Sequence, residues 1–268
     1  MFKIVFLDID GTLLKSDHTI SAPTIEIIQR LKKEHVPVVL VSARPLHGIT
    51  RIAETTGLLD LPIASLNGAL IAIQGKVIFE LPIDIDLTPP LHEYLKQYHV
   101  TPIFYNHHRW FSGINNQHTI YEQQITDVPI TIEPFMDTFQ HWQKLGKGPD
   151  KILAIGDAFK IKELENDLIP QFGRHLNIYP SKPTYLEIMN REASKLNAVK
   201  YVLAKYHFKQ EETIAIGDNY NDMEMIAFAG MGVAMGNSPD EVKTAADYIT
   251  DTNNQDGVFK AIKYLMNL

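Results

Sequence analysis

The chain has 268 residues, of which 45% are hydrophobic, and a formal net charge of −7. This length and composition allow one large globular domain or two smaller ones. Because the chain has no cysteine, it cannot form disulfides, thiolate zinc sites or a cysteine nucleophile, and Asp, Glu, His, Ser and Lys must supply any chemistry. The excess of acidic residues and the absence of a Lys/Arg run argue against nucleic acid as a partner. They still permit anionic small molecules.

The apolar segments are too short for membrane insertion. Only four charge-poor residues separate Lys3 from Asp8, fewer than the apolar region of a signal peptide requires. No apolar run approaches the roughly 20 residues of a spanning helix. We therefore expect a cytoplasmic protein without a membrane partner.

The first part of the chain alternates between strand and helix patterns. The apolar run KIVFLDID stops at an Asp-Gly turn, which is typical of a buried parallel strand. Pro23 opens a helix that ends before Val36-Pro37, and strand, helix and strand in this order predict a right-handed βαβ unit. The predicted strands lie at 3–10, 36–44, 62–73 and 77–83, and the predicted helices at 21–35 and 48–56.

The middle of the chain has a different composition. Prolines cluster at positions 82, 89 and 90, and seven of the eleven histidines fall between residues 84 and 184. We interpret 84–184 as an inserted α+β domain. Its predicted helices lie at 91–98 and 161–172, and its predicted strands within 101–111, 128–134, 151–157 and 175–189.

The α/β alternation returns after the insert. Helices are predicted at 193–206 and from about 221, 238 and 257, with strands at 213–218 and 231–236. Alternation on both sides of the insert predicts an α/β fold, a doubly wound, Rossmann-like parallel sheet formed by residues 1–83 and 185–268. In such sheets ligands bind at the carboxyl ends of the strands, so polar residues at those ends are candidate site residues.

These strand ends carry carboxylates and phosphate-binding groups. Converging Asp8, Asp10 and Asp218 would repel one another without a hard divalent cation, and an oxygen-only ligand set favours Mg²⁺. Asp8 can attack phosphorus to form an aspartyl phosphate. Since residues i and i+2 of a strand point to the same side, Asp10 can then serve as general acid and base. The groups expected to bind the phosphate are Lys195, Ser42, Asn221 and the backbone N–H groups at Gly11.

Four segments resemble the motifs of the haloacid dehalogenase superfamily, in the usual order: FLDIDGTLL, VSAR, Lys195 in EASKLNAVKYVL, and IGDNYND. The insert between the second and third motifs, with NGALI and YLEIMNREASK, resembles Cof-type phosphatases with a type IIB cap, the domain that would select the substrate.

This resemblance implies a role for each matched residue. Asp8 would be the nucleophile and a metal ligand. Asp10 would be the general acid and base, and its backbone carbonyl would bind the metal. Asp218 would be a further metal ligand. Asp222 would support the metal's water shell. The residues that would hold the phosphate are Ser42, Lys195 and Asn221. Apart from the resemblance, Arg44 is a candidate contact to the inserted domain or to a substrate.

Three functions stay open at this point. The first is a Mg²⁺-dependent phosphatase acting on small phosphorylated metabolites such as sugar phosphates. The second is a phosphomutase with the same nucleophile, and the third a non-catalytic regulator that binds a phosphometabolite. The sequence does not identify the substrate; we take a monomer as the default, with a homodimer open.

Two further patterns have structural interpretations. Asp157 in KILAIGDAFK repeats the strand-Gly-Asp pattern of the fourth motif without its following Asn and Asp, so we interpret it as a helix N-cap. His107 and His108 are candidate ligands for substrate or a second metal, but neighbours on a strand point to opposite faces. We expect one to be exposed and the other to pack against aromatic residues such as Trp110.

Overall fold

The computed structural model describes residues 2–268, which divide into two compact units. Among these residues, the first unit comprises 2–79 and Ser194–Leu268, and the second Glu80–Ala193. The second unit therefore extends beyond the predicted insert at both ends. Residues 185–193 belong to it because the strand Tyr185–Asn190 pairs with two strands of its sheet.

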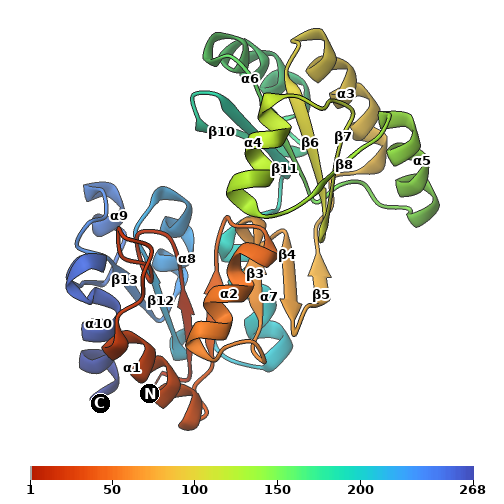
Figure 1. The fold of residues 1–268 in the computed structure, drawn as a ribbon. Helices are drawn as coiled ribbons and strands as arrows, with labels where there is room; N and C mark the ends of the chain where they lie inside the picture. The colour runs from red at the N-terminus through yellow and green to blue at the C-terminus, as the bar shows by residue number, and fades with distance from the viewer. Residues whose placement is uncertain (1) are drawn as a thin grey trace. The chain divides into compact units, whose positions relative to one another are not determined.

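The first unit is a sheet with helices on both faces (Figure 1). Among the described residues, eight strands form this sheet in the order β14-β13-β12-β1-β2-β3-β4-β5. Pairing is parallel from β14 to β3, and β4 runs antiparallel to β3. The strands are β1 (Ile4–Leu7), β2 (Val38–Val41), β3 (Ile63–Ser65), β4 (Leu70–Ile73), β5 (Lys76–Glu80), β12 (Thr213–Gly217), β13 (Met231–Ala234) and β14 (Tyr248–Ile249).

Strand alternation divides the core of this unit into two layers. Val5 and Leu7 of β1 pack with helices α1, α2 and α10, while Ile4 and Phe6 pack with α7 and α8 on the other face. The α-helices of this unit are α1 (Ala22–Lys33), α2 (Leu46–Thr56), α7 (Lys195–Tyr206), α8 (Met223–Phe228), α9 (Asp240–Thr244) and α10 (Gly257–Met266). The predicted doubly wound α/β fold is confirmed for this unit.

The second unit is a sheet with helices packed against it, most of them on one face. Among residues 80–193, six strands pair in the order β10-β11-β9-β6-β7-β8, all antiparallel except β7 and β8. The strands are β6 (Thr101–Asn106), β7 (Arg109–Ser112), β8 (Ile130–Ile132), β9 (Lys151–Ile155), β10 (Leu176–Lys182) and β11 (Tyr185–Asn190). The helices are α3 (Thr88–Gln97), α4 (Gln117–Thr126), α5 (Phe135–Leu145) and α6 (Ala158–Phe172).

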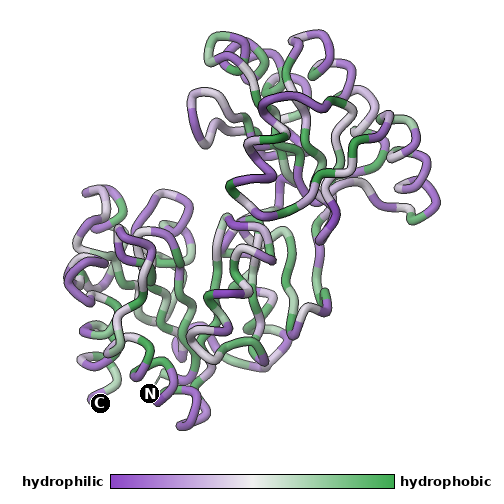
Figure 2. The backbone as a smooth tube through the Cα atoms, viewed as in Figure 1, coloured by the Kyte–Doolittle hydropathy of each residue, from purple (hydrophilic) through white to green (hydrophobic). Residues whose placement is uncertain are grey.

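The core of the second unit is aromatic. Trp142 of α5 packs against Phe104 and Phe111 of the sheet, with ring centroids 5.6 and 6.0 Å away, and α3 and α6 add leucines to the same cluster. Figure 2 shows hydrophobic segments following the strands within each unit, so each unit has its own core.

Short 3-10 helices complete the secondary structure: η1 (Leu66–Gly68), η2 (Ile85–Leu87), η3 (Gln210–Glu212), η4 (Tyr220–Asp222) and η5 (Asn253–Gln255). No helix within residues 2–268 has both the length and the apolar character needed to cross a lipid bilayer.

The stability of the second unit can be measured separately, because both tryptophans of the chain, Trp110 and Trp142, lie in it. Leu164 of α6 is fully buried in its core. We expect Leu164→Ala to lower the free energy of unfolding by about 2–5 kcal/mol, since it leaves a cavity. Urea unfolding followed by tryptophan fluorescence measures this change.

The matched control is Phe159→Ala on the same helix, because the Phe159 side chain is 70% exposed. This variant should change the free energy of unfolding by no more than about 0.5 kcal/mol. Equal destabilisation by both variants would contradict the assignment of the core.

Candidate active site

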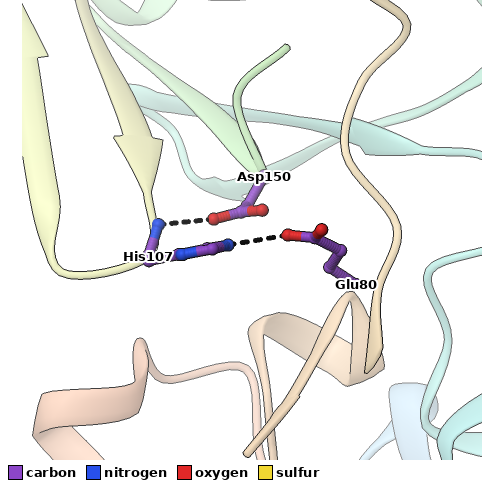
Figure 3. Close-up of side chains that lie close together, drawn as sticks. All are labelled: Glu80, His107 and Asp150. Atoms are coloured by element: carbon purple, nitrogen blue, oxygen red, sulfur yellow. Dashed lines mark hydrogen bonds and ion pairs between the residues drawn. The ribbon is translucent and has the colours of Figure 1, made fainter. Parts of the chain in front are cut away.

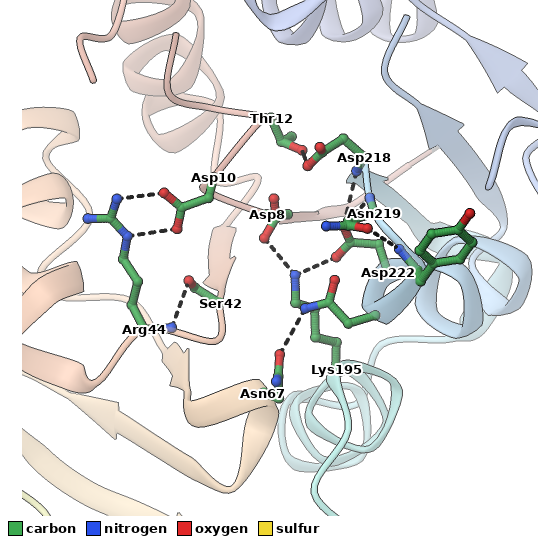
Figure 4. A network of polar contacts seen from close by, with 12 residues as sticks. Asp8, Asp10, Thr12, Ser42, Arg44, Asn67, Lys195, Asp218, Asn219 and Asp222 are labelled. Atoms are coloured by element: carbon green, nitrogen blue, oxygen red, sulfur yellow. Dashed lines mark hydrogen bonds and ion pairs between the residues drawn. The ribbon is translucent and has the colours of Figure 1, made fainter. Parts of the chain in front are cut away.

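Polar side chains gather where the central strands of the first unit end (Figure 4). Asp8 follows β1, Ser42 follows β2 and Asp218 follows β12, as the rule for parallel sheets predicts. The Asp8 amide continues the β1–β12 ladder, donating to the Ile216 carbonyl at 3.0 Å. These strand ends therefore meet at one edge of the sheet, as predicted.

Lys195, the first residue of α7, lies at the centre of this group. Its Nζ is 2.6 Å from Asp8 Oδ1 and 2.5 Å from Asp222 Oδ1, and its side chain is 2% exposed. Burial by itself lowers the pKa of Lys195, but the two carboxylates outweigh burial and raise that pKa above its usual value. Lys195 therefore stays protonated, and one ammonium compensates two buried carboxylates.

The position of Lys195 follows from the start of its helix. Ser194 caps α7, its Oγ accepting from the Asn197 amide at 3.1 Å. Directly beside it is Gly68, at φ +85°, where a Cβ atom would lie 2.5 Å from the Ser194 carbonyl oxygen. Only glycine allows the Asn67-Gly68 turn to approach α7 this closely.

Three carboxylates form a compact cluster. One oxygen from each of Asp8, Asp218 and Asp222 lies within 4.8 Å of the others. Burial raises the pKa of Asp8 well above its usual value, and the charge of Asp222 raises it further. Burial also raises the pKa of Asp218. A cation at this cluster would relieve the repulsion, and an oxygen-only donor set with two buried members and the partly buried Asp218 fits a hard divalent ion.

Asp222 differs from the other two because one of its oxygens accepts from two backbone amides while the other accepts from Lys195. Oδ1 accepts from Lys195, and Oδ2 accepts from the backbone amides of Asp218 and Asn219, each at 3.0 Å. Asp222 thus fixes the turn that carries Asp218. Asp8 and Asp218 are the carboxylates suited to direct metal ligation.

Asp10 lies outside the carboxylate cluster and pairs with Arg44. Arg44 Nε and an Nη donate to the two Asp10 oxygens at 2.7 and 2.5 Å, and the Arg44 amide donates to Ser42 Oγ at 3.1 Å. The predicted strand at 3–10 is too long, because β1 ends at Leu7 and Asp8 to Asp10 form a loop. Strand alternation therefore does not govern how the Asp8 and Asp10 side chains point.

The turn after Asp10 requires glycine for a steric reason. Gly11 has φ +79°, and a Cβ atom there would lie 2.3 Å from Asp218 Oδ2. The same turn is fastened by Asn237, whose Nδ2 donates to the Gly11 carbonyl at 2.9 Å. Gly11 thus brings the Asp10 loop against Asp218.

Asn221 and three unpredicted residues complete the network. Asn221 Nδ2 donates to Asn67 Oδ1 at 3.0 Å, and Thr12 Oγ1 donates to Asp218 Oδ1 at 2.9 Å. Sequence reasoning did not assign Thr12, Asn67 or Asn237 to the site. Asn237 lies just after β13, so the strand-end rule could have found it, and Thr12 directly follows the Gly11 turn.

We expect Asp222→Asn to lower the free energy of unfolding by about 2–3 kcal/mol, because an amide cannot accept hydrogen bonds both from Lys195 and from the two buried backbone amides. The amide would also place a donor against either the Lys195 ammonium or the two backbone N–H groups. Urea unfolding followed by far-UV circular dichroism measures the change.

Asp251→Asn is the matched control, because Asp251 pairs with Lys260 on the surface of the same unit with half-exposed side chains. Its cost should not exceed about 1 kcal/mol. A cost for Asp222→Asn as small as that of the control would refute the positioning role of Asp222.

The sequence and fold match known proteins over nearly the whole chain. The chain is 36% identical to a Haemophilus influenzae protein named "Putative phosphatase", in an alignment that covers 96% of each chain. It is 30% identical to the 5-amino-6-(5-phospho-D-ribitylamino)uracil phosphatase YcsE of Bacillus subtilis, covering 98% of this chain and 95% of the relative. A crystal structure of a haloacid dehalogenase-like hydrolase from Bacteroides thetaiotaomicron matches with a TM-score of 0.88 and 31% identity, covering 99% and 100% of the two chains. The model of the haloacid dehalogenase-like hydrolase family matches residues 5–262, and the chain belongs to this family of hydrolases.

Proposed function

We propose that the protein is a Mg²⁺-dependent phosphatase that hydrolyses small phosphorylated metabolites through a phosphoryl group carried on Asp8. The observation that carries the proposal is the buried contact of 2.6 Å between Asp8 and Lys195 at the end of β1. It holds one carboxylate oxygen in place and puts a positive charge where a phosphate would arrive.

The proposed reaction has two displacements. In the first, an Asp8 oxygen attacks phosphorus, the bond to the leaving oxygen breaks, and Asp10 gives that oxygen a proton. In the second, Asp10 takes a proton from water, the water oxygen attacks phosphorus, and inorganic phosphate leaves with Asp8 regenerated. Asp10 is unchanged over the full cycle.

Arg44 sets the resting position of Asp10 in this scheme. Both Asp10 oxygens accept from the Arg44 guanidinium, so Asp10 must be released before it can donate a proton to a leaving group. The Asp10 side chain is half-exposed, which gives it room to turn. Arg44, once free, is a candidate contact to the substrate.

The other groups offset charge around the phosphate. We assign phosphate binding to Lys195, Ser42, Asn221 and the backbone amides at Gly11. Asp8, Asp218 and the Asp10 backbone carbonyl would hold Mg²⁺, and Asp222 would support its water shell. The ion would neutralise negative charge on the phosphate oxygens. The fit of this donor set to a hard cation supports Mg²⁺.

The relatives support the substrate class. One relative at 30% identity is named as a phosphatase of a phosphoribityl compound, a small phosphate monoester. We extend this class to the present chain as small sugar-like or related monoesters, with the second unit as the domain that selects among them.

The test is phosphate release from a panel of small phosphate monoesters, with Mg²⁺ and again with EDTA. EDTA should abolish turnover and added Mg²⁺ restore it. Asp8→Asn should reduce turnover by at least about 1,000-fold, because it removes the nucleophile.

Asp157→Asn is the matched control. Asp157 has the same local pattern as Asp218 but lies in the second unit, where it caps α6 by accepting from the Phe159 amide at 2.9 Å. This variant should keep wild-type turnover. Undiminished turnover by Asp8→Asn would refute the mechanism, and isomerisation of a hexose phosphate in place of phosphate release would favour the phosphomutase.

A further inference from the structure

A second cluster of potential metal ligands is formed by residues of the second unit, which begins at Glu80. One ligand atom each of Glu80, His107 and Asp150 lies within 4.8 Å of the other two (Figure 3). His107 Nε2 is 2.7 Å from Glu80 Oε2, and the His107 amide donates to Asp150 Oδ2 at 2.6 Å. Glu80 ends β5, His107 follows β6 and Asp150 precedes β9, so three separate segments contribute.

Backbone contacts hold these segments together. The Asp150 amide donates to the Tyr105 carbonyl at 2.8 Å, which fixes Asp150 against the hairpin that carries His107. The Ile83 amide donates to the Pro149 carbonyl at 2.8 Å, which fixes the segment after Glu80. At Gly148 a Cβ atom would lie 2.2 Å from the Ile83 carbonyl oxygen, so the two segments are in close contact. The cluster is therefore built on a fixed framework.

Asp150 is the unusual member of this cluster. Its side chain is buried, at 1% exposure, and its Oδ1 has no hydrogen-bond partner among the described residues. A buried carboxylate oxygen without a partner is costly, and most such atoms in folded proteins have one. Burial also raises the pKa of the Asp150 carboxyl above its usual value. The neighbouring positive charge, Lys147, hydrogen-bonds to Glu80 instead.

We propose that Glu80, His107 and Asp150 bind a divalent transition-metal ion such as Zn²⁺, with the unpartnered Asp150 oxygen as one ligand. Two carboxylates and one imidazole suit Zn²⁺, whereas Mg²⁺ prefers oxygen donors alone. Two negative charges would balance the ion, and water would complete its coordination.

Ion binding requires two local changes. At metal–ligand distances near 2.0–2.1 Å, tetrahedral ligands lie about 3.3 Å apart, so the His107–Glu80 pair, now 2.7 Å apart, must open by about 0.6 Å. The half-exposed Lys147 must release Glu80, which makes it a competitor of the metal. Since Glu80 is the first residue of the second unit, the ion would tie the entering chain to the hairpin after β6.

The test is a calorimetric titration of the full chain with Zn²⁺, in an Asp218→Asn background so that the first unit's carboxylate cluster contributes less. One Zn²⁺ should bind per chain. His107→Asn, which tolerates the φ of +51° at this position, and Asp150→Asn should each weaken binding by at least about tenfold. Lys147→Gln should strengthen it, by up to about fivefold, because it removes the competitor.

The matched control is His108→Asn, since His108 is exposed on the same hairpin and outside the cluster. It should bind Zn²⁺ as the parent does. A second readout is tryptophan fluorescence, where Zn²⁺ should raise the unfolding temperature of the parent but not that of His107→Asn. Absence of a zinc site, or equal zinc affinity in the parent and His107→Asn, would overturn the proposal.

Discussion

The buried ammonium of Lys195, shared between Asp8 and Asp222, is the interaction on which the site depends. Without it, two carboxylates at the centre of the first unit would be buried and uncompensated, at a cost of several kcal/mol each. With it, Asp8 is fixed at the end of β1 and Asp222 is fixed beneath the turn that carries Asp218. A single side chain thus organises residues from three distant parts of the sequence.

The backbone determines where that ammonium lies. The chain returns to the first unit at Ser194, and α7 begins at the next residue with its first turn against Gly68. Gly11 likewise allows a close approach, because it lets the Asp10 loop reach Asp218. Both contacts exclude a Cβ atom, so steric fit at two glycines sets the spacing of the charged groups.

The sequence was sufficient to predict the α/β alternation of the first unit and that Asp8, Ser42 and Asp218 follow its parallel strands, because apolar periodicity predicts the strands and parallel strands end at one edge of a sheet. It also placed Asp157 correctly as the cap of α6. It could not predict side-chain partners, such as Arg44 on Asp10 or Asn67 on Asn221, because these depend on loops brought together by the fold.

The helices missed in the second unit have separate causes. The buried positions of α4 include the polar residues Thr119 and Glu122, so α4 lacks the apolar stripe that identifies an amphipathic helix. In α5, by contrast, Phe135, Thr138 and Trp142 are buried at helical spacing, so the sequence pattern could have predicted this helix. His108 is exposed, as expected for one of the two histidines. His107 was expected to pack against aromatic residues such as Trp110, but it contacts Glu80 instead.

The two carboxylate clusters differ in how their charge is balanced, and this difference favours different ions. In the first unit the compensating ammonium is buried and held by two carboxylates, so it persists beside any metal bound at Asp8 and Asp218. In the second unit Lys147 is half-exposed and held by Glu80, so an incoming cation can displace it into water. An oxygen-only site with a permanent ammonium suits the hard cation proposed for the first unit, whereas an imidazole beside an unpartnered buried oxygen suits the transition-metal ion proposed for the second.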